Sequence, residues 1–303
     1  MGSTVCPRSF VMIQCIAYRL LILAGLLLHS CQYGWAQPSS RIRGVALDVD
    51  INGGLFVLDR DRNTLRQYVN DTMLVREIGG PGWGDDQFDS PTGLWARNGI
   101  DVFVADYGNH RIQRFDRSLS FVGTFSTRDS DNPDERFGYP IDVALSRLGD
   151  LFICDTENIR VVKVNRFSRV ERVFGGFDAG KGRLHSPSGL EVGPYDRVHV
   201  LDPPRIIVFD TFGNYVADLA PGFFRSPSCL YADVDGVVVC DEGSLYCFDR
   251  EGRPAATVSL DSLLNSSGVT VRSLAFSRTT LYILTSEGMI TAPNPRPSAE
   301  EVR

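Results

Sequence analysis

A short segment that ends in proline recurs four times along this chain, and an aspartate follows it each time at nearly the same distance. The prolines are Pro91, Pro140, Pro187 and Pro227. The aspartates, which close an apolar run 14 or 15 residues later, are Asp106, Asp155, Asp202 and Asp241. A fixed period of this kind indicates an array of similar structural units, and it limits the possible folds more than any other feature of the sequence.

Each unit contains four short runs that are rich in β-branched and aromatic residues. In the second unit these runs cover residues 93–97, 101–106, 111–116 and 119–125, with Gly, Asn, Asp and Ser between them. The units repeat every 40 to 49 residues, and a four-stranded sheet of that size can bury its faces only against its neighbours. A leading copy at 45–59 and a trailing copy at 273–285 are recognisable. We therefore predict an all-β fold, a six-bladed β-propeller of four-stranded antiparallel blades.

The linkers between the units point to a family. Residues 79–91 (GGPGWGDDQFDSP) and 175–187 (GGFDAGKGRLHSP) each precede a strand that ends in Val-Ala-Asp or Val-Leu-Asp, and residues 109–116 read NHRIQRFD. These segments resemble NHL repeats, most clearly in units two to four. The resemblance implies a six-bladed β-propeller and agrees with the count of units.

The recurring residues themselves favour a structural role. Glycine supplies backbone freedom in tight loops, proline fixes the entry to the first strand, and aspartate caps a hairpin by accepting hydrogen bonds from backbone amides. The last unit shows only three strand-like runs before a proline-rich tail. Its fourth strand is either missing or supplied by residues 37–43, which would join the two ends of the chain and remove exposed sheet edges.

The first 36 residues have the order of a secretory signal peptide. Arg8 and Arg19 precede the apolar run 20–28, and Gly34-Trp35-Ala36 ends the segment with a small-x-small pattern. We expect a signal peptide at 1–36, a propeller at 37–293 and a disordered tail at 294–303. The protein is then exported, with no transmembrane span after processing. A lipoprotein anchored at Cys31 is the alternative.

The net charge and the cysteine positions limit the classes of partner and cofactor that we expect. Arg8 and Arg19 are the only charged residues among the first 36, so the net charge falls from −6 to about −8 on their removal, which argues against a nucleic-acid partner. Cys229 and Cys240 fall on adjacent strands of the fifth unit, where a disulfide could form. No Cys-x-x-Cys or similar spacing indicates a metal site, so we expect no cofactor.

Two groups of residues are candidates for a functional site. The first lies on the inner strands, where Asp142, Glu191, Trp95 and Tyr231 could line a central channel. A lyase related to the peptide-amidating type would bind a divalent ion there through convergent histidines, yet His110, His185 and His199 occupy three different positions in their units. Carboxylates in such a channel are also commonly solvated rather than catalytic.

The second group lies on one face of the disc. The loops that carry the prolines and the hairpins that follow the aspartates meet at the same edge of an antiparallel sheet. The candidate binding residues of this face are Trp83, Tyr107, His110, Tyr139 and His185. Phe88, Phe137 and Phe224 also precede prolines, but we expect them to pack between blades. Aromatic and polar groups together are typical of recognition surfaces.

These observations predict an exported, monomeric, non-catalytic module that binds a protein or peptide or acts as a scaffold. The alternative is a secreted propeller lyase or hydrolase, similar to an amidating lyase or a lactonase, that uses the central channel and a divalent ion. Under that alternative Asp142, Glu191 or His185 would be essential, and the aromatic residues of the outer loops would not.

Overall fold

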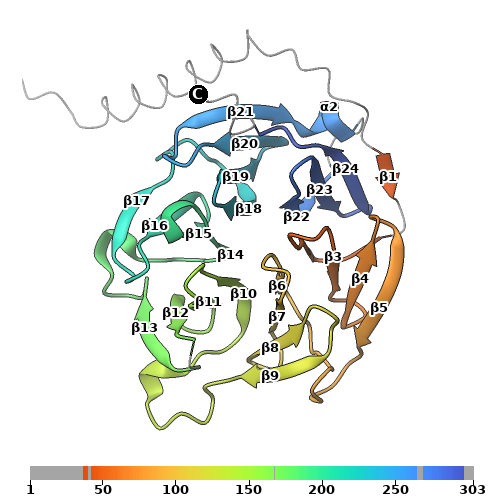
Figure 1. The fold of residues 1–303 in the computed structure, drawn as a ribbon. Coiled ribbons are helices and arrows are strands. Elements are labelled where there is room, and N and C mark those ends of the chain that lie inside the picture. Colours follow the sequence, from red (N-terminus) through yellow and green to blue (C-terminus); the bar gives the residue numbers. More distant parts are fainter. Residues whose placement is uncertain (1–36, 40–41, 167, 265–268, 297–303) are drawn as a thin grey trace, which may run out of the picture.

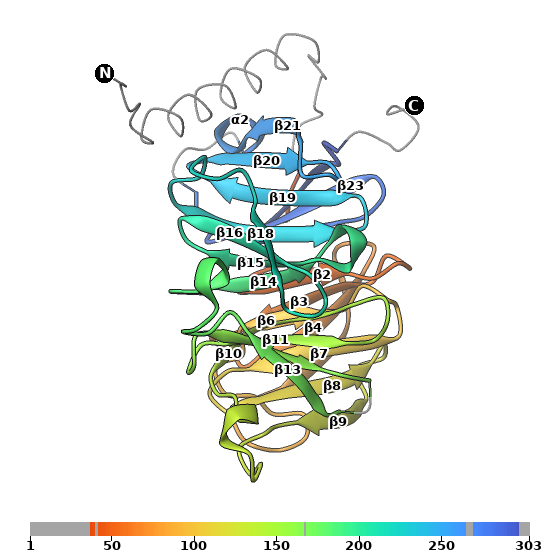
Figure 2. The same ribbon diagram turned by 90° about the vertical axis from the view of Figure 1, so that its left-hand side faces the viewer.

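The computed structural model describes residues 37–39, 42–166, 168–264 and 269–296. Six four-stranded antiparallel sheets stand in a ring around a central axis (Figure 1). Figure 2 shows the disc from its edge, with strands that run from one face to the other. The predicted six-bladed β-propeller is confirmed. The expected signal peptide, with Cys6, Cys15 and Cys31, lies outside the described residues. Within those residues no helix is long and apolar enough to cross a membrane.

Blades one to three follow the chain from the inner to the outer strand. Blade one consists of β2 (Ala46–Val49), β3 (Leu55–Asp59), β4 (Thr64–Val69) and β5 (Met73–Gly79). Blade two consists of β6 (Gly93–Trp95), β7 (Asp101–Asp106), β8 (Arg111–Asp116) and β9 (Phe121–Phe125). Blade three consists of β10 (Pro140–Leu145), β11 (Leu151–Asp155), β12 (Arg160–Val164) and β13 (Val170–Phe174).

Blades four and five have the same order. Blade four consists of β14 (Gly189–Val192), β15 (Val198–Asp202), β16 (Arg205–Phe209) and β17 (Tyr215–Asp218). Blade five consists of β18 (Pro227–Asp233), β19 (Gly236–Asp241), β20 (Ser244–Phe248) and β21 (Pro254–Ser259). The short helical elements are η1 (Pro133–Glu135), η2 (Gly180–Gly182), η3 (Pro194–Asp196) and α2 (Leu260–Leu264).

Blade six joins the two ends of the chain. It contains β22 (Val271–Phe276), β23 (Thr280–Thr285) and β24 (Met289–Pro293), and its outer strand is β1 (Gln37–Ser39). β1 is antiparallel to β24, with Pro38 opposite Ile290. Residues 37–39, the first part of the segment 37–43, therefore supply the fourth strand, which is one of the two arrangements that the sequence left open, and the pairing closes the ring.

The core lies between neighbouring blades. Phe88, Phe137 and Phe224 are all buried there, as their position before proline predicted. The ring of Phe88 packs edge-on against Phe115 of its own blade at a centroid distance of 6.0 Å. Burying one such side chain stabilises the fold by about 2 kcal/mol. These residues hold the ring together and leave its two faces to other functions.

The recurring aspartates tie the loops to the hairpins. Oδ1 of Asp106 accepts the backbone N–H of Asp89 at 2.7 Å, and its other oxygen accepts Arg111 Nε at 2.7 Å. Asp202 and Asp241 bind amides of the loops before Pro187 and Pro227 in the same way. The amides belong mainly to the loop between blades rather than to the hairpin that the sequence pattern suggested.

Two further expectations concern blade five and the tail. Cys229 and Cys240 are opposite each other on β18 and β19 and form a disulfide. Cys154 and Cys247 are buried free thiols. Residues 297–303 of the expected disordered tail lie outside the described residues. Arg296, in contrast, has a defined place, because its Nη1 donates to Asp233 Oδ2 at 2.7 Å.

Candidate functional site: the loop face and the central cavity

The face that carries the proline loops and the aspartate hairpins, called the loop face here, holds an aromatic cluster. The ring of Tyr107, after β7, lies 5.1 Å from that of Tyr139, in the loop before β10. The ring of His110 meets Tyr139 edge-on at 4.2 Å. We call Tyr107, His110 and Tyr139 the aromatic cluster. It spans the junction of blades two and three, and 40% of Tyr139 is exposed to solvent.

The backbone of Tyr139 is held from both sides. Its N–H donates to His110 Nδ1 at 3.0 Å, and its carbonyl accepts the hydroxyl of Thr156 at 2.6 Å. Tyr139 has a φ of 47°, which costs energy for a residue with a Cβ and persists only where neighbours enforce it. The exposed ring is therefore presented in a fixed position before any ligand arrives.

His110 contributes through its neutral form. Nδ1 lies 2.9 Å from Nη2 of Arg128 as well as accepting from Tyr139. Partial burial, together with the charge of Arg128, lowers the pKa of His110 below its usual value of 6.5. With Nδ1 as acceptor, the proton of the neutral ring is on Nε2. That N–H is a donor for a ligand on the loop face.

The other two loop-face candidates lie outside the aromatic cluster. Trp83 is 70% exposed, and its carbonyl accepts Arg111 Nη1 at 3.0 Å, which fixes the loop while the indole faces solvent. His185 is exposed in blade four, where its Nδ1 lies 3.2 Å from Nη2 of Arg205. Of the five predicted residues, the structure brings together Tyr107, His110 and Tyr139.

A cavity of about 230 Å³ occupies the axis of the ring. Its lining includes Arg60 of the loop after β3, Arg272 of β22, and both predicted carboxylates, Asp142 and Glu191. Arg60 also lies over the ring of Tyr107, 5.8 Å from the centroid. The cavity and the aromatic cluster are therefore parts of one continuous surface.

Asp142 links two inner strands. Its Oδ2 accepts the N–H of Leu190 in the next blade at 3.0 Å, and its Oδ1 accepts the N–H of Val143 at 2.9 Å. Asp48 makes the equivalent bond from blade one, with Oδ2 accepting the N–H of Ala96 at 2.9 Å. Both carboxyls stabilise the junction of neighbouring blades, so the predicted channel position of Asp142 also has a structural use.

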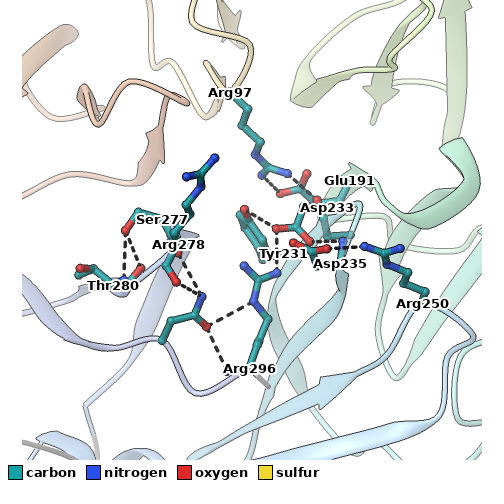
Figure 3. A network of polar contacts seen from close by, with 12 residues as sticks. Arg97, Glu191, Tyr231, Asp233, Asp235, Arg250, Ser277, Arg278, Thr280 and Arg296 are labelled. Atoms are coloured by element: carbon teal, nitrogen blue, oxygen red, sulfur yellow. Dashed lines mark hydrogen bonds and ion pairs between the residues drawn. The ribbon is translucent and has the colours of Figure 1, made fainter. Parts of the chain in front are cut away.

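Arg97 forms the floor of the cavity and connects four blades. From blade two, Nη2 donates to Glu191 Oε1 of blade four at 2.6 Å, and Nε lies 3.1 Å from Asp48 Oδ1 of blade one. Nη1 donates to the carbonyl of Ala232 in blade five at 2.5 Å. Figure 3 shows Arg97 reaching toward Glu191 above the ring of Tyr231, whose centroid is 4.3 Å from the guanidinium carbon.

On the face opposite the loop face, Arg296 packs against residues of blades five and six. Arg296 stacks on Phe276 at 4.2 Å and also lies 5.5 Å from the centroid of Tyr231. The hydroxyl of Tyr231 donates to Asp233, the same carboxylate that pairs with Arg296 (Figure 3). Tyr231, a predicted channel residue, therefore lies under the floor and is buried. Trp95, another, is buried against Phe103 and is not part of the cavity lining.

The carboxyl groups at the floor have unusual proton affinities. Burial raises the pKa of Glu191 to about 8 and that of Asp142 to about 7, and the charge of Arg97, which acts in the opposite direction, is shared among these two carboxyls and that of Asp48. Oε2 of Glu191 is buried and has no hydrogen-bond partner among the described residues. Perturbed acids beside a cavity are a feature of catalytic sites, although structural networks produce them too.

The three histidines bind different partners. His199 is buried, its Nδ1 lies 3.1 Å from the carbonyl of Arg197, and burial lowers its pKa to about 4. In the part of the chain that the structure describes, no three His, Cys, Asp or Glu side chains are arranged to hold a metal ion. The geometry therefore offers a polar cavity and an aromatic surface.

Sequence reasoning missed the arginines of the site. Arg97, Arg60 and Arg272 were not among the candidates, although Arg272 occupies the same place in its blade as Thr92 and Ser188, directly at the start of the inner strand. Aligning the blades position by position would have placed Arg272 at the rim. Nothing in the repeat pattern indicates that Arg97 reaches across the axis.

Comparisons with known proteins agree with the fold. No family model matches the chain. Protein brain tumor of Drosophila melanogaster is 31% identical over 134 residues, 43% of this chain and 12% of that protein. B-box type zinc finger protein ncl-1 of Caenorhabditis elegans is 28% identical over 134 residues, 43% of this chain and 15% of that protein. The matches thus span less than a sixth of either relative.

Solved structures with the same architecture include bacterial lyases. A virginiamycin B lyase of Staphylococcus aureus superposes with a TM-score of 0.58 at 12% identity, over 81% of this chain and 78% of that one. A streptogramin B lyase gives 0.58 at 13% identity, over 82% and 78%. At such identities the likeness shows the fold alone. The two sequence relatives are NHL-repeat proteins, so the comparisons agree with the resemblance of the repeat motifs over 43% of this chain and with the six-bladed β-propeller.

Proposed function

We propose that this chain is an exported NHL propeller that binds a protein or peptide through its loop face and catalyses no reaction. The observation that carries the proposal is the aromatic cluster, in which Tyr139 is held exposed by hydrogen bonds to its own backbone. Preorganised, partly exposed aromatic side chains lose little entropy on binding and are the usual anchors of protein interfaces.

Polar groups surround the aromatic cluster. Arg60 lies beside Tyr107, and Arg128 lies beside His110 and pairs with Glu157 at 3.2 Å. An apolar centre with a charged rim is the common anatomy of a recognition surface. The net charge of −6 supports a protein or peptide rather than a nucleic acid as the ligand. We propose that the module works as a monomer.

The proposal of export is supported by the disulfide between Cys229 and Cys240. Disulfides persist in oxidising compartments and are rare in the cytosol. N-terminal sequencing of exported material tests this part. A mature chain that starts at Gln37 agrees with it, lipidated Cys31 supports the anchored alternative, and an intact Met1 or Met12 contradicts cleavage.

The alternative function, a lyase or hydrolase acting in the central cavity, has one observation in its favour. Glu191 and Asp142 line the cavity and titrate near neutral pH. The lyases that share the architecture add only the fold. Against this reading, both oxygens of Asp142 already accept backbone amides, and Glu191 is paired with Arg97.

The two proposed functions predict opposite effects of the same substitutions. Capture of partners from the extracellular fraction by immobilised mature protein should be lost with Tyr107→Ala and Tyr139→Ala, and kept with Glu191→Gln. The enzyme alternative requires the opposite pattern in a turnover assay. Equal capture by wild type and both tyrosine variants would exclude the aromatic cluster as the binding site.

A further inference from the structure

The central cavity has three tiers from the loop face inward. At its rim lie six residues, one from each blade, that directly precede the first residue of the inner strand or directly follow it: Val45, Thr92, Ile141, Ser188, Ser228 and Arg272. Below them lies a wall of leucines, which includes Leu47, Leu94, Leu230 and Leu274 of the inner strands. Arg97 and Glu191 form the floor. A polar rim above an apolar wall suits a ligand group that is itself polar at one end and apolar at the other.

The charge at the rim is not compensated. Nη1 of Arg272 donates to the carbonyl of Gly44 at 2.9 Å, and the side chain of Arg60 lies beside Tyr107. Neither guanidinium takes part in an ion pair with any described residue, and both residues are exposed. Arg97 at the floor, in contrast, already has Asp48 and Glu191 as partners. The two rim arginines are therefore the groups with capacity to receive an anion.

A carboxylate is the anion that fits this arrangement. Guanidinium groups bind carboxylates through paired, charge-assisted hydrogen bonds, and the leucine wall below offers an apolar partner to an aliphatic group attached nearby. The floor offers no free cation, because the guanidinium of Arg97 is already paired with Asp48 and Glu191. The anionic end of a ligand is thus directed to the rim and its aliphatic part to the wall.

We propose that the central cavity is a subsite for an aliphatic group that carries a carboxylate, with Arg272 and Arg60 binding the carboxylate and the leucine wall binding the aliphatic part. This inference rests on the proposed loop-face function and names the chemistry of the ligand. The C-terminal residue of a peptide has this chemistry, and so does a free branched-chain carboxylic acid. Arg60 contacts both the cavity and Tyr107, so a peptide chain leaving the cavity would cross the aromatic cluster.

The test uses a small probe that needs only the cavity. N-acetyl-leucine, with N-acetyl-leucinamide as its uncharged match, is titrated into the mature protein while the methyl NMR signals of Leu47 and Leu274 are followed. We expect saturable shifts with the acid and a dissociation constant about tenfold or more higher for the amide, since a hydrogen bond to a charged group is lost. Arg60→Ala combined with Arg272→Ala should abolish the difference between acid and amide.

Arg278→Ala is the matched control. Arg278 is an exposed arginine that follows the other end of the same strand, β22, on the face opposite the loop face, so its loss should leave binding of the acid unchanged. Thermal unfolding of each variant checks that the fold is intact. Equal affinity for acid and amide, an absence of binding, or equal losses with Arg278→Ala would overturn the proposal. None of these results decides whether the aromatic cluster binds a partner, because the capture experiment tests that separately.

A second arm separates the two sources of the carboxylate. Acetyl-Tyr-Ala-Leu with a free C-terminus is compared with N-acetyl-leucine on wild type and on Tyr139→Ala. A peptide ligand predicts tighter binding of the tripeptide that Tyr139→Ala removes, while N-acetyl-leucine is unaffected. Equal binding of both probes to both proteins supports the cavity subsite with a free carboxylic acid as its ligand. Loss of N-acetyl-leucine binding in Tyr139→Ala would contradict a subsite confined to the cavity.

Discussion

Arg97 of blade two donates to Glu191 of blade four at 2.6 Å, across the axis of the propeller. The same guanidinium contacts Asp48 of blade one and the carbonyl of Ala232 in blade five. One side chain thus connects four of the six blades on the inner side. The cross-link requires several buried carboxyl groups, and the single positive charge of Arg97 cannot neutralise all of them.

The pH dependence of stability tests this imbalance. Because burial raises the pKa of Glu191 to about 8 from 4.5, the folded state holds this proton more tightly than the unfolded chain. The resulting stabilisation is complete below about pH 4.5 and is lost as the pH rises through 8. Between pH 6.5 and 9, the unfolding free energy of wild type should fall by about 2 kcal/mol more than that of Glu191→Gln.

The range from pH 6.5 to 9 excludes the titration of His199. Burial lowers the pKa of His199 to about 4 from 6.5, so its contribution is complete above pH 6.5 and is lost as the pH falls. Glu287→Gln is the control, because Glu287 is exposed and its substitution keeps the titrations of both Glu191 and Asp142. Denaturant unfolding at each pH gives the free energies. Parallel curves for wild type and Glu191→Gln would show that Glu191 has an ordinary pKa in the fold.

Ring closure gives a prediction about the N-terminal strand. Removing residues 37–42 takes away β1 and its pairing with β24, which leaves an open edge in blade six. A loss of about 2 kcal/mol, from hydrogen bonds and packing, should lower the melting temperature by about 5 °C. Removal of residues 298–303 is the length-matched control. Identical melting curves for the two shortened proteins would contradict a stabilising role of β1.

The aspartates of the repeat differ from other turn aspartates in the groups to which they are hydrogen-bonded. Asp106→Ala leaves Nε of the buried Arg111 and the amide of Asp89 without their acceptor and removes the counter-ion of Arg111, at a cost of about 3 kcal/mol or more. Asp116→Ala removes hydrogen bonds to Ser118 and Ser120 in an exposed turn, at a cost of about 1 kcal/mol. Chemical denaturation compares them, and equal losses would mean that Asp106 is only a turn residue.

The blades could be predicted because their signals are local. Proline and aspartate recur at fixed spacing, and both act on the loop and hairpin of their own blade. The sequence of each repeat is therefore enough to predict the strands of that blade. The strands predicted at 101–106 and 111–116 are those observed. The pairing of β1 with β24 could be anticipated only as one of two possibilities, because it joins Gln37 to Thr291 from the opposite end of the chain.

The site could be predicted only in part, because it depends on contacts across the ring. Trp95 and Tyr231 occupy the same position in their blades, yet Trp95 packs on Phe103 and Tyr231 stacks under Arg97. The repeat assigns both to the inner strand and does not say which side chain from another blade will meet them. The aromatic cluster, in contrast, could be predicted from the sequence, because Tyr107 and His110 share one hairpin and Tyr139 lies directly before the first strand of the next blade.

The central claim, that the aromatic cluster binds a peptide, is tested most directly by affinities of peptides selected on the mature protein from a random library. Tyr139→Ala should weaken them by about 2 kcal/mol, close to thirtyfold in Kd. The matched control is Tyr195→Ala, since Tyr195 is also an exposed tyrosine with positive φ, in η3 on the face opposite the loop face. Fluorescence titration of wild type and both variants should show the loss for Tyr139→Ala alone. Equal affinities for all three proteins would contradict the account.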